Sequence, residues 1–210
     1  LSEKNYDLNG DGIWDTFDLC SMKQAYTKQT IEGERNTLVA YFSATGNTKK
    51  IAEYIAAYTG ADSYDITPAI PYTTEDLNYS NSSCRANQEQ NDASCRPEIS
   101  GSVENMDNYD VVYIGYPIWW GEEPRIIDTF LESYDFSDKI VIPFCTSGSS
   151  SIAASEDRIA NLGVSIGNQL PGKRFSGSAS EKSVSDWIST LDLPKQTIDT
   201  RISIAVNNHT

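Results

Sequence analysis

The strongest constraint on the fold is an alternation, from Thr37 onward, of short apolar runs with stretches of helical periodicity. Two of the runs are almost continuously apolar, as expected of parallel strands that are buried on both faces. The predicted strands are residues 37–42, 63–66, 110–116, 139–145 and 164–170. The predicted helices are residues 48–58, 124–134, 152–162 and 181–191. This alternation predicts a doubly wound α/β fold around a five-stranded parallel sheet.

The chain divides into three parts by composition. Residues 1–30 are polar and acidic, and the segment 27–36, which contains Gly33, reads as a linker to a main domain at 37–192. Residues 193–210 form a C-terminal tail. The connection 68–108 is long and polar, so we expect a helix within 75–93 and irregular chain around it.

Composition excludes two classes of partner. The net charge of -14 argues against nucleic-acid binding, because a phosphate backbone would be repelled. No apolar run approaches the length of a membrane span. The four cysteines lack the paired spacing of a zinc site. Whether Cys84 and Cys95 form a disulfide is left open by the sequence.

The turn after the first predicted strand has the composition of a phosphate site. It consists of Ser43, Ala44, Thr45, Gly46, Asn47 and Thr48. Its hydroxyls and its glycine precede a helix start, where free N–H groups and the helix dipole favour an anion. The alternative is a capping turn, because Ser, Thr and Asn favour helix starts for stability alone.

Nucleotide-binding motifs of other kinds are disfavoured. The turn lacks the lysine of a Walker A loop and the GxGxxG spacing of a dinucleotide site. Residues 167–173 match half of a Walker motif, but Arg174 stands where a serine or threonine would hold magnesium.

Four segments in order resemble the flavodoxin family. Residues 38–48 resemble its FMN phosphate signature, while 115–121, 129–132 and 142–148 resemble the subgroup that carries a PIWWG loop. The resemblance covers about 37–192 and implies a flavodoxin-like fold that holds FMN.

The resemblance also implies two loops around the flavin ring. The implied contacts are Pro117, Ile118, Trp119, Trp120 and Gly121 in one loop, and Thr146, Ser147, Gly148 and Ser149 in the other. One tryptophan of the pair is expected to stack on the ring and the other to belong to the core. The second loop is expected near the pyrimidine edge, with capping of the next helix as an alternative role.

The sequence motifs give little support for nucleophilic catalysis. No GxSxG elbow is present, and the only histidine, His209, stands at the end of the chain. Cys145 reads as a small core residue. We therefore expect no catalytic triad.

The N-terminal segment has the spacing of a calcium loop, with Gly12 at the sixth position. The predicted ligands are Asp7, Asn9, Asp11, the Ile13 carbonyl, Asp15 and Asp18. The segment resembles one type I dockerin repeat, although dockerins carry two. The resemblance implies Ca²⁺, a possible cohesin partner and export, while a solvated acidic turn and a cytoplasmic location stay open.

The leading functional hypothesis is an FMN-binding redox protein. It would carry electrons to a partner protein or reduce a small acceptor such as a quinone with NAD(P)H. The alternative is a calcium-dependent assembly protein whose flavodoxin-like shell holds no flavin.

Overall fold

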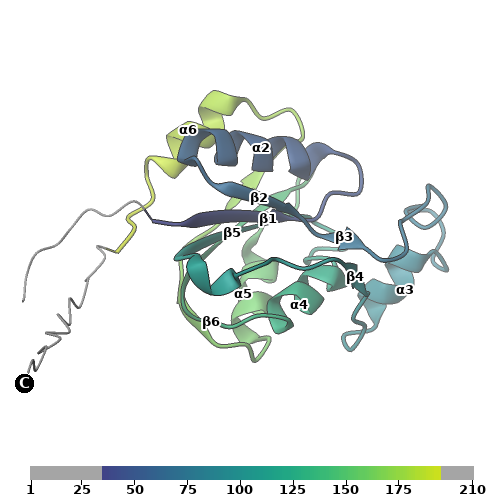
Figure 1. Cartoon of the computed structure of the whole chain (residues 1–210). Coiled ribbons are helices and arrows are strands. Elements are labelled where there is room, and N and C mark those ends of the chain that lie inside the picture. The colour runs from purple at the N-terminus through teal and green to yellow at the C-terminus, as the bar shows by residue number, and fades with distance from the viewer. Residues whose placement is uncertain (1–34, 195–210) are drawn as a thin grey trace, which may run out of the picture. The chain divides into compact units, whose positions relative to one another are not determined.

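The computed structural model describes residues 35–194, which fold around a parallel β-sheet (Figure 1). The strand order is β2-β1-β5-β6-β7. The bounds are β1 Thr37–Tyr41, β2 Asp62–Asp65, β5 Val111–Pro117, β6 Phe136–Thr146 and β7 Ile166–Gln169. The predicted flavodoxin-like sheet is therefore confirmed.

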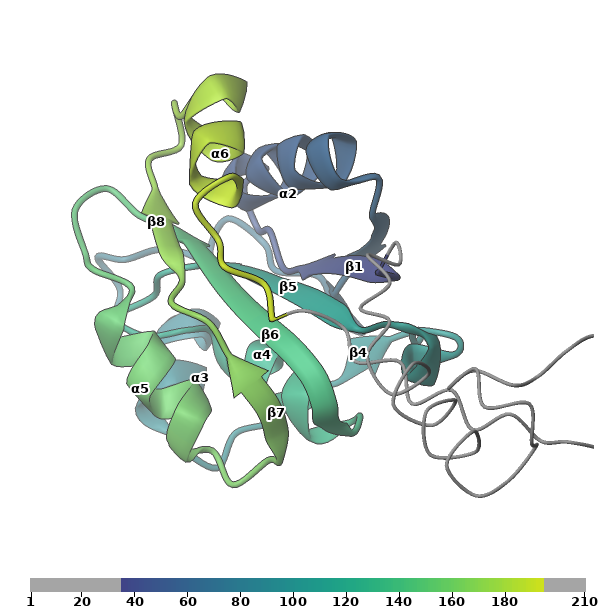
Figure 2. The same ribbon diagram turned by 90° about the vertical axis from the view of Figure 1, so that its left-hand side faces the viewer.

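The last position of the sheet is shared by two short strands. β7 pairs with the first half of β6, and β8 (Lys173–Phe175) pairs with its end (Figure 2). The break falls between β7 and β8, where Pro171 stands, whereas β6 continues through Pro143 and stays paired with β5. Proline has no N–H to donate to a ladder, so the pairing stops and resumes beyond it. The prediction of one strand over 164–170 missed β8.

Helices cover both faces of the sheet (Figures 1 and 2). α2 (Asn47–Thr59) and α6 (Glu181–Ile188) lie on one face. α4 (Arg125–Glu132) and α5 (Ala153–Asn161) lie on the other face. Each predicted helix is present within a few residues of its expected bounds, because each has an apolar stripe that the sheet buries.

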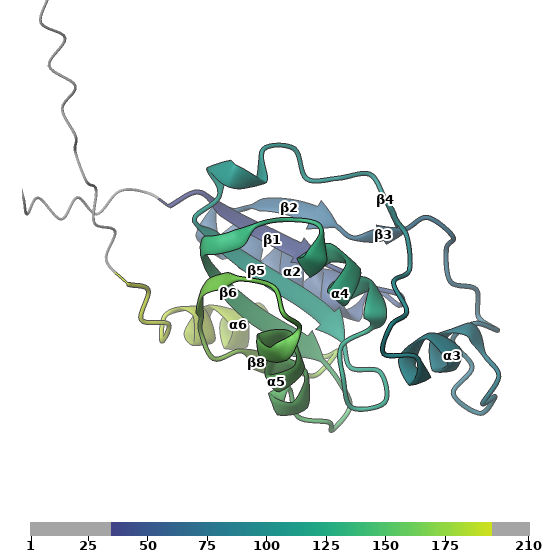
Figure 3. The same cartoon turned by 90° about the horizontal axis from the view of Figure 1, so that it is seen from below.

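The connection between β2 and β5 contains a segment, residues 67–100, whose two ends pair with each other (Figure 3). We call this segment the excursion. Its base is a two-stranded antiparallel sheet of β3 (Thr67–Pro68) and β4 (Ile99–Ser100). Between them lies α3 (Arg85–Asn91), inside the range predicted for a helix. A short 3-10 helix, Met106–Asn108, leads into β5. The two-stranded base was not predicted.

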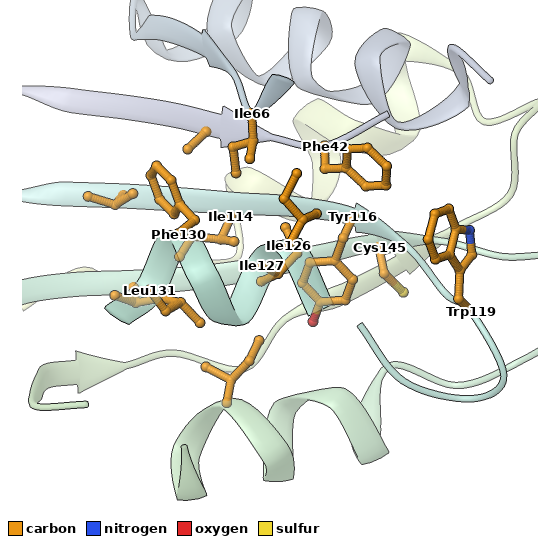
Figure 4. Close-up of a cluster of buried hydrophobic side chains, with 14 of the residues drawn as sticks. Phe42, Ile66, Ile114, Tyr116, Trp119, Ile126, Ile127, Phe130, Leu131 and Cys145 are labelled. Atoms are coloured by element: carbon orange, nitrogen blue, oxygen red, sulfur yellow. The ribbon is translucent and has the colours of Figure 1, made fainter. Parts of the chain in front are cut away.

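The main core lies between the sheet and α4 and α5 (Figure 4). Ile126, Ile127, Phe130 and Leu131 of α4 are fully buried against it. The Tyr116 hydroxyl lies 3.0 Å from the Ser155 hydroxyl, which ties β5 to α5. This packing fixes the loops that leave the carboxyl ends of the strands.

Two expectations from composition can be compared with residues 35–194. In this part of the chain no helix is long and apolar enough to cross a bilayer. Cys84 and Cys145 are buried and Cys95 is half-buried, and all three are free thiols, so the Cys84–Cys95 pairing that the sequence left open is not formed.

Candidate cofactor-binding site

The carboxyl ends of β1, β5 and β6 meet at one edge of the sheet. Tyr41 pairs with Gly115, and Pro117 pairs with Thr146. The strand order reverses between β1 and β5, and open α/β sheets bind ligands at such a switch point. The three predicted loops start here.

The start of α2 has the geometry of an anion site. Gly46 precedes the helix with φ of 84°, and no side chain caps the helix. A Cβ at Gly46 would meet nothing within 4 Å, so the glycine serves the left-handed backbone and leaves the approach open. The N–H groups of the first turn have no partner within the helix. The capping alternative is therefore not supported by the geometry.

Two side-chain features reinforce this site. The Ser43 hydroxyl is buried and has no hydrogen-bond partner among the described residues. Lys49 and Lys50 stand in the first turn of α2, which has no acidic residue. The N-terminal end of a helix carries a partial positive charge, so two lysines there are unfavourable by themselves. A bound anion offsets both the lysine charges and the helix dipole.

The two tryptophans of the second loop have different environments. Trp119 is buried and packs edge-on against Phe42, with ring centroids 5.5 Å apart (Figure 4). Trp120 is 38% exposed and stacks on Tyr79, with centroids 4.5 Å apart and planes 15° apart. One tryptophan thus belongs to the core, as expected for one of the pair, and the other is partly exposed; stacking of Trp120 on the flavin ring stays a prediction.

A tight turn presents Trp120. Trp119 and Glu122 exchange two backbone hydrogen bonds of 2.9 and 3.1 Å. The residues between them, Trp120 and Gly121, have φ of 48° and 94°. These left-handed values are typical of a two-residue hairpin turn, and a tryptophan there is strained.

The first two loops enclose a pocket of about 230 Å³. It is lined by Ser43, Ala44, Thr45, Thr48, Leu77, Tyr79, Ala86, Pro117, Ile118, Trp119 and Trp120. The structure thus brings the phosphate turn and the tryptophan loop together. Gly46, Asn47 and Gly121 stand beside the lining residues in the chain and do not line the pocket themselves.

The third predicted loop lies behind this pocket and does not line it. The Thr146 hydroxyl is 2.8 Å from that of Thr48, and both side chains are buried. Ser147 accepts a hydrogen bond from Arg174 Nε at 3.0 Å and donates one to the Ser150 carbonyl at 2.6 Å. Arg174 also binds the carbonyls of Ser147 and Gly148. The Ser147 hydroxyl is therefore engaged in holding the loop.

Sequence reasoning missed the wall of the pocket that the excursion supplies. Leu77, Tyr79 and Ala86 lie in the polar connection, where nothing in the local pattern marks them as lining residues. Tyr72 of the same excursion packs against Trp119 with centroids 5.2 Å apart. Burial, followed by a hydrogen bond to Glu89, raises the pKa of Tyr72 well above its usual range.

The predicted calcium ligands, Asp7, Asn9, Asp11, Ile13, Asp15 and Asp18, lie outside the described residues and stay a prediction, as do the cohesin partner and export. Among residues 35–194, no cluster of acidic, cysteine or histidine side chains is arranged to hold a metal ion.

Comparison with known proteins identifies the family. The profile of the flavodoxin family, described as "Flavodoxin", matches residues 36–191. The chain belongs to the flavodoxin family. A comparison with curated proteins gave no match.

Solved structures of other flavodoxin-like proteins agree with this assignment. A protein from Bacteroides eggerthii described as a candidate flavoprotein is 42% identical, with a TM-score of 0.71, and the match covers 76% of this chain and 99% of that one. A flavoprotein from Lactobacillus acidophilus, solved in complex with FMN, is 25% identical with a TM-score of 0.57, and the match covers 73% of this chain and 99% of that one. The resemblance to the family inferred from the sequence is thereby confirmed, while the PIWWG subgroup stays a prediction.

Proposed function

We propose that this flavodoxin family member binds FMN and works as a redox protein. The observation that carries the proposal is the uncapped start of α2 behind a left-handed Gly46, with the unpaired Ser43 hydroxyl at the same pocket. The FMN found in the Lactobacillus acidophilus relative supports this choice of ligand.

The residues present fit the cofactor. The N–H groups at the start of α2 and the Ser43 hydroxyl would hold the phosphate, because they are donors without partners of their own. Ile118 and Trp120 would provide apolar surface for the ring. Bound FMN supplies the electron-transfer chemistry, and the protein orients it and excludes water from its ring.

The electron acceptor is a basic protein or a small molecule such as a quinone. A net charge of -14 favours a basic partner through electrostatic steering. A partner that binds through such steering should exchange electrons more slowly at high salt.

The experiment that tests the proposal is a titration of the flavin-free protein with FMN and, separately, with riboflavin. Flavin fluorescence should be quenched on binding to an aromatic pocket. FMN should bind far more tightly than riboflavin, and inorganic phosphate should compete with it, because the α2 site recognises the phosphate. Absence of FMN binding at micromolar concentrations would refute the proposal.

A matched pair of variants tests the position of the ring. Trp120→Leu should weaken FMN binding by about tenfold, which corresponds to ~1.4 kcal/mol of lost aromatic contact. Tyr58→Leu removes an aromatic ring that is also exposed but lies near the far end of α2, and should leave the affinity unchanged. Bleaching of the bound flavin by NAD(P)H would then indicate a reductase, and its absence a carrier.

A further inference from the structure

A cluster of ionisable side chains, three of them buried, lies beside the Trp119–Glu122 turn and does not line the pocket. We call Glu122, Glu123, Arg125, Asp128 and Arg158 the buried ion cluster. The side chains of Glu123 and Asp128 are 0% exposed. Burying charges is costly unless they are paired and their hydrogen bonds are complete.

Arg158 of α5 holds both buried carboxylates. Its Nε donates to Glu123 Oε1 at 2.8 Å, and its Nη2 donates to Asp128 Oδ2 at 2.9 Å. Because one planar guanidinium binds both groups, the two carboxylates lie next to each other. When both groups are ionised, Glu123 Oε2 and Asp128 Oδ1 are buried and have no hydrogen-bond partner among residues 35–194. Two such oxygens in a closed interior call for a proton donor.

The charges around this pair do not balance. Arg96 at the rim binds Glu132 at 2.7 Å and lies 3.7 Å from Asp128. Together with the buried ion cluster this gives three guanidinium groups, of residues 96, 125 and 158, against four carboxylates, of residues 122, 123, 128 and 132. One additional proton makes the assembly neutral.

We propose that Glu123 and Asp128 share one proton, and that the resulting singly charged pair is the positioning element of the Trp119–Glu122 turn. A proton on Glu123 lets it donate to Asp128, which satisfies oxygens of both groups. It also removes the repulsion between two adjacent buried anions.

The titration behaviour of the pair agrees with this arrangement. Burial is the largest cause that raises the pKa of Glu123, to about 7, while the hydrogen bond from Arg158 lowers it. Burial also raises the pKa of Asp128, against the lowering effect of Arg158. The charged and titratable groups that face the pair are Glu122 of the turn, Arg125 of α4, Arg158 of α5, Arg96 ahead of β4 and Tyr116 of β5.

The pair is connected to the turn by short bonds. The Glu123 carbonyl accepts a hydrogen bond from Gln90 of α3 at 2.9 Å, and Arg125 donates to the Gln90 carbonyl at 2.8 Å and to Glu122 at 2.9 Å. Glu122 in turn pairs with Trp119 and holds Trp120 in its strained conformation. Loss of the proton places an unbalanced buried charge under this turn. On the basis of the proposed function, the form with the proton is the one that binds FMN tightly.

The test compares wild type, Glu123→Gln and the control Asp157→Asn, which alters an exposed carboxylate next to Arg158 on the same helix. The glutamine amide donates to Asp128 at every pH and carries no charge. In wild type the protonated fraction falls from about 0.9 at pH 6 to about 0.1 at pH 8, so the Kd for FMN should rise about tenfold. Asp157→Asn should follow wild type, and Glu123→Gln should lose this rise. The FMN phosphate titrates near pH 6 in all three proteins alike.

A second measurement separates this proposal from FMN binding. For the flavin-free wild type, the free energy of unfolding should fall as the pH rises from about 4.5 to 7 and then level off, because the pKa of Glu123 is higher in the folded than in the unfolded state. Wild type should also show the infrared carbonyl band of a protonated carboxyl group at pH 6, and lose it by pH 8. The infrared measurement uses wild type alone, so it does not depend on whether a variant folds. If the band is absent, or if Glu123→Gln keeps the pH dependence of wild type, the proposal is wrong; absence of FMN binding at every pH would instead refute only the proposed function and the link to it.

Discussion

The hydrogen bond between Thr48 and Thr146 links the phosphate turn to the third loop, and its removal has a calculable cost. The two hydroxyls are 2.8 Å apart, and the side chains are 1% and 6% exposed. Thr48→Val removes this bond and leaves the Thr146 hydroxyl buried without its partner, which costs about 1–3 kcal/mol. We expect a loss of about 2 kcal/mol of stability from either single valine variant.

The double variant should behave differently from the sum of the two single variants. When Thr48 and Thr146 both become valine, two apolar groups of the same shape replace the bonded pair and no polar group is left unpaired. The double variant should therefore lie within about 1 kcal/mol of wild type. Set against a sum of about 4 kcal/mol for the two single variants, this corresponds to a coupling energy of about 3 kcal/mol or more.

Urea unfolding of wild type, both single variants and the double variant measures this coupling directly. The control combines Thr48→Val with Thr59→Val, about 16 Å away along α2, and those two effects should add. Additive losses for the Thr48 and Thr146 pair would refute the reasoning. FMN titration of the stable double variant would then report what these hydroxyls contribute to phosphate binding, apart from their role in folding.

Three further outcomes are expected. Arg174→Met removes the bonds to Ser147 and to the Gly148 carbonyl, so it should weaken FMN binding severalfold in the titration described above; an unchanged affinity would show that the third loop does not need this anchor. Burial raises the pKa of the Cys145 thiol to about 12, so a thiol reagent at pH 8 should label it only after the protein unfolds, and rapid labelling of the folded protein would contradict its burial. Gly115→Ala would place a Cβ 2.1 Å from the Phe144 ring, and urea unfolding should show a loss of about 3 kcal/mol or more, whereas Gly148→Ala, with open space around it, serves as the control.

The sequence pattern was sufficient for most of the sheet and the helices, because these depend on local periodicity. The runs that became β5 and the second half of β6 are almost continuously apolar, and α4 has its apolar residues on one face. The turn at 43–48 was also recognisable as a candidate anion site, because its six residues follow a buried strand and precede a helix, and its role in binding phosphate stays a prediction. β8 was not identifiable, because two of its three residues, Lys173 and Arg174, are charged and only Phe175 is apolar. This strand forms because the end of β6 is available for pairing.

The buried ion cluster shows what a local pattern cannot reveal. Glu122, Glu123 and Asp128 read as residues of an exposed helix start, where acidic side chains are common. The burial of Glu123 and Asp128 depends on Arg158, which is 30 residues from Asp128 in the chain, and on the position of α3. Tyr79 was missed for the same reason, since only the folded excursion brings it against Trp120.

The closed base of the excursion has a consequence for how such a chain can diversify. The Ala69 N–H donates to the Glu98 carbonyl at 2.8 Å, so the two ends of this 30-residue segment lie side by side. Residues inserted, deleted or exchanged between these ends leave the strand order of the sheet unchanged. Such changes nevertheless alter Leu77, Tyr79 and Ala86, which line the pocket. Proteins that share the sheet and the turn at 43–48 can therefore differ in the lining of this pocket through this one segment.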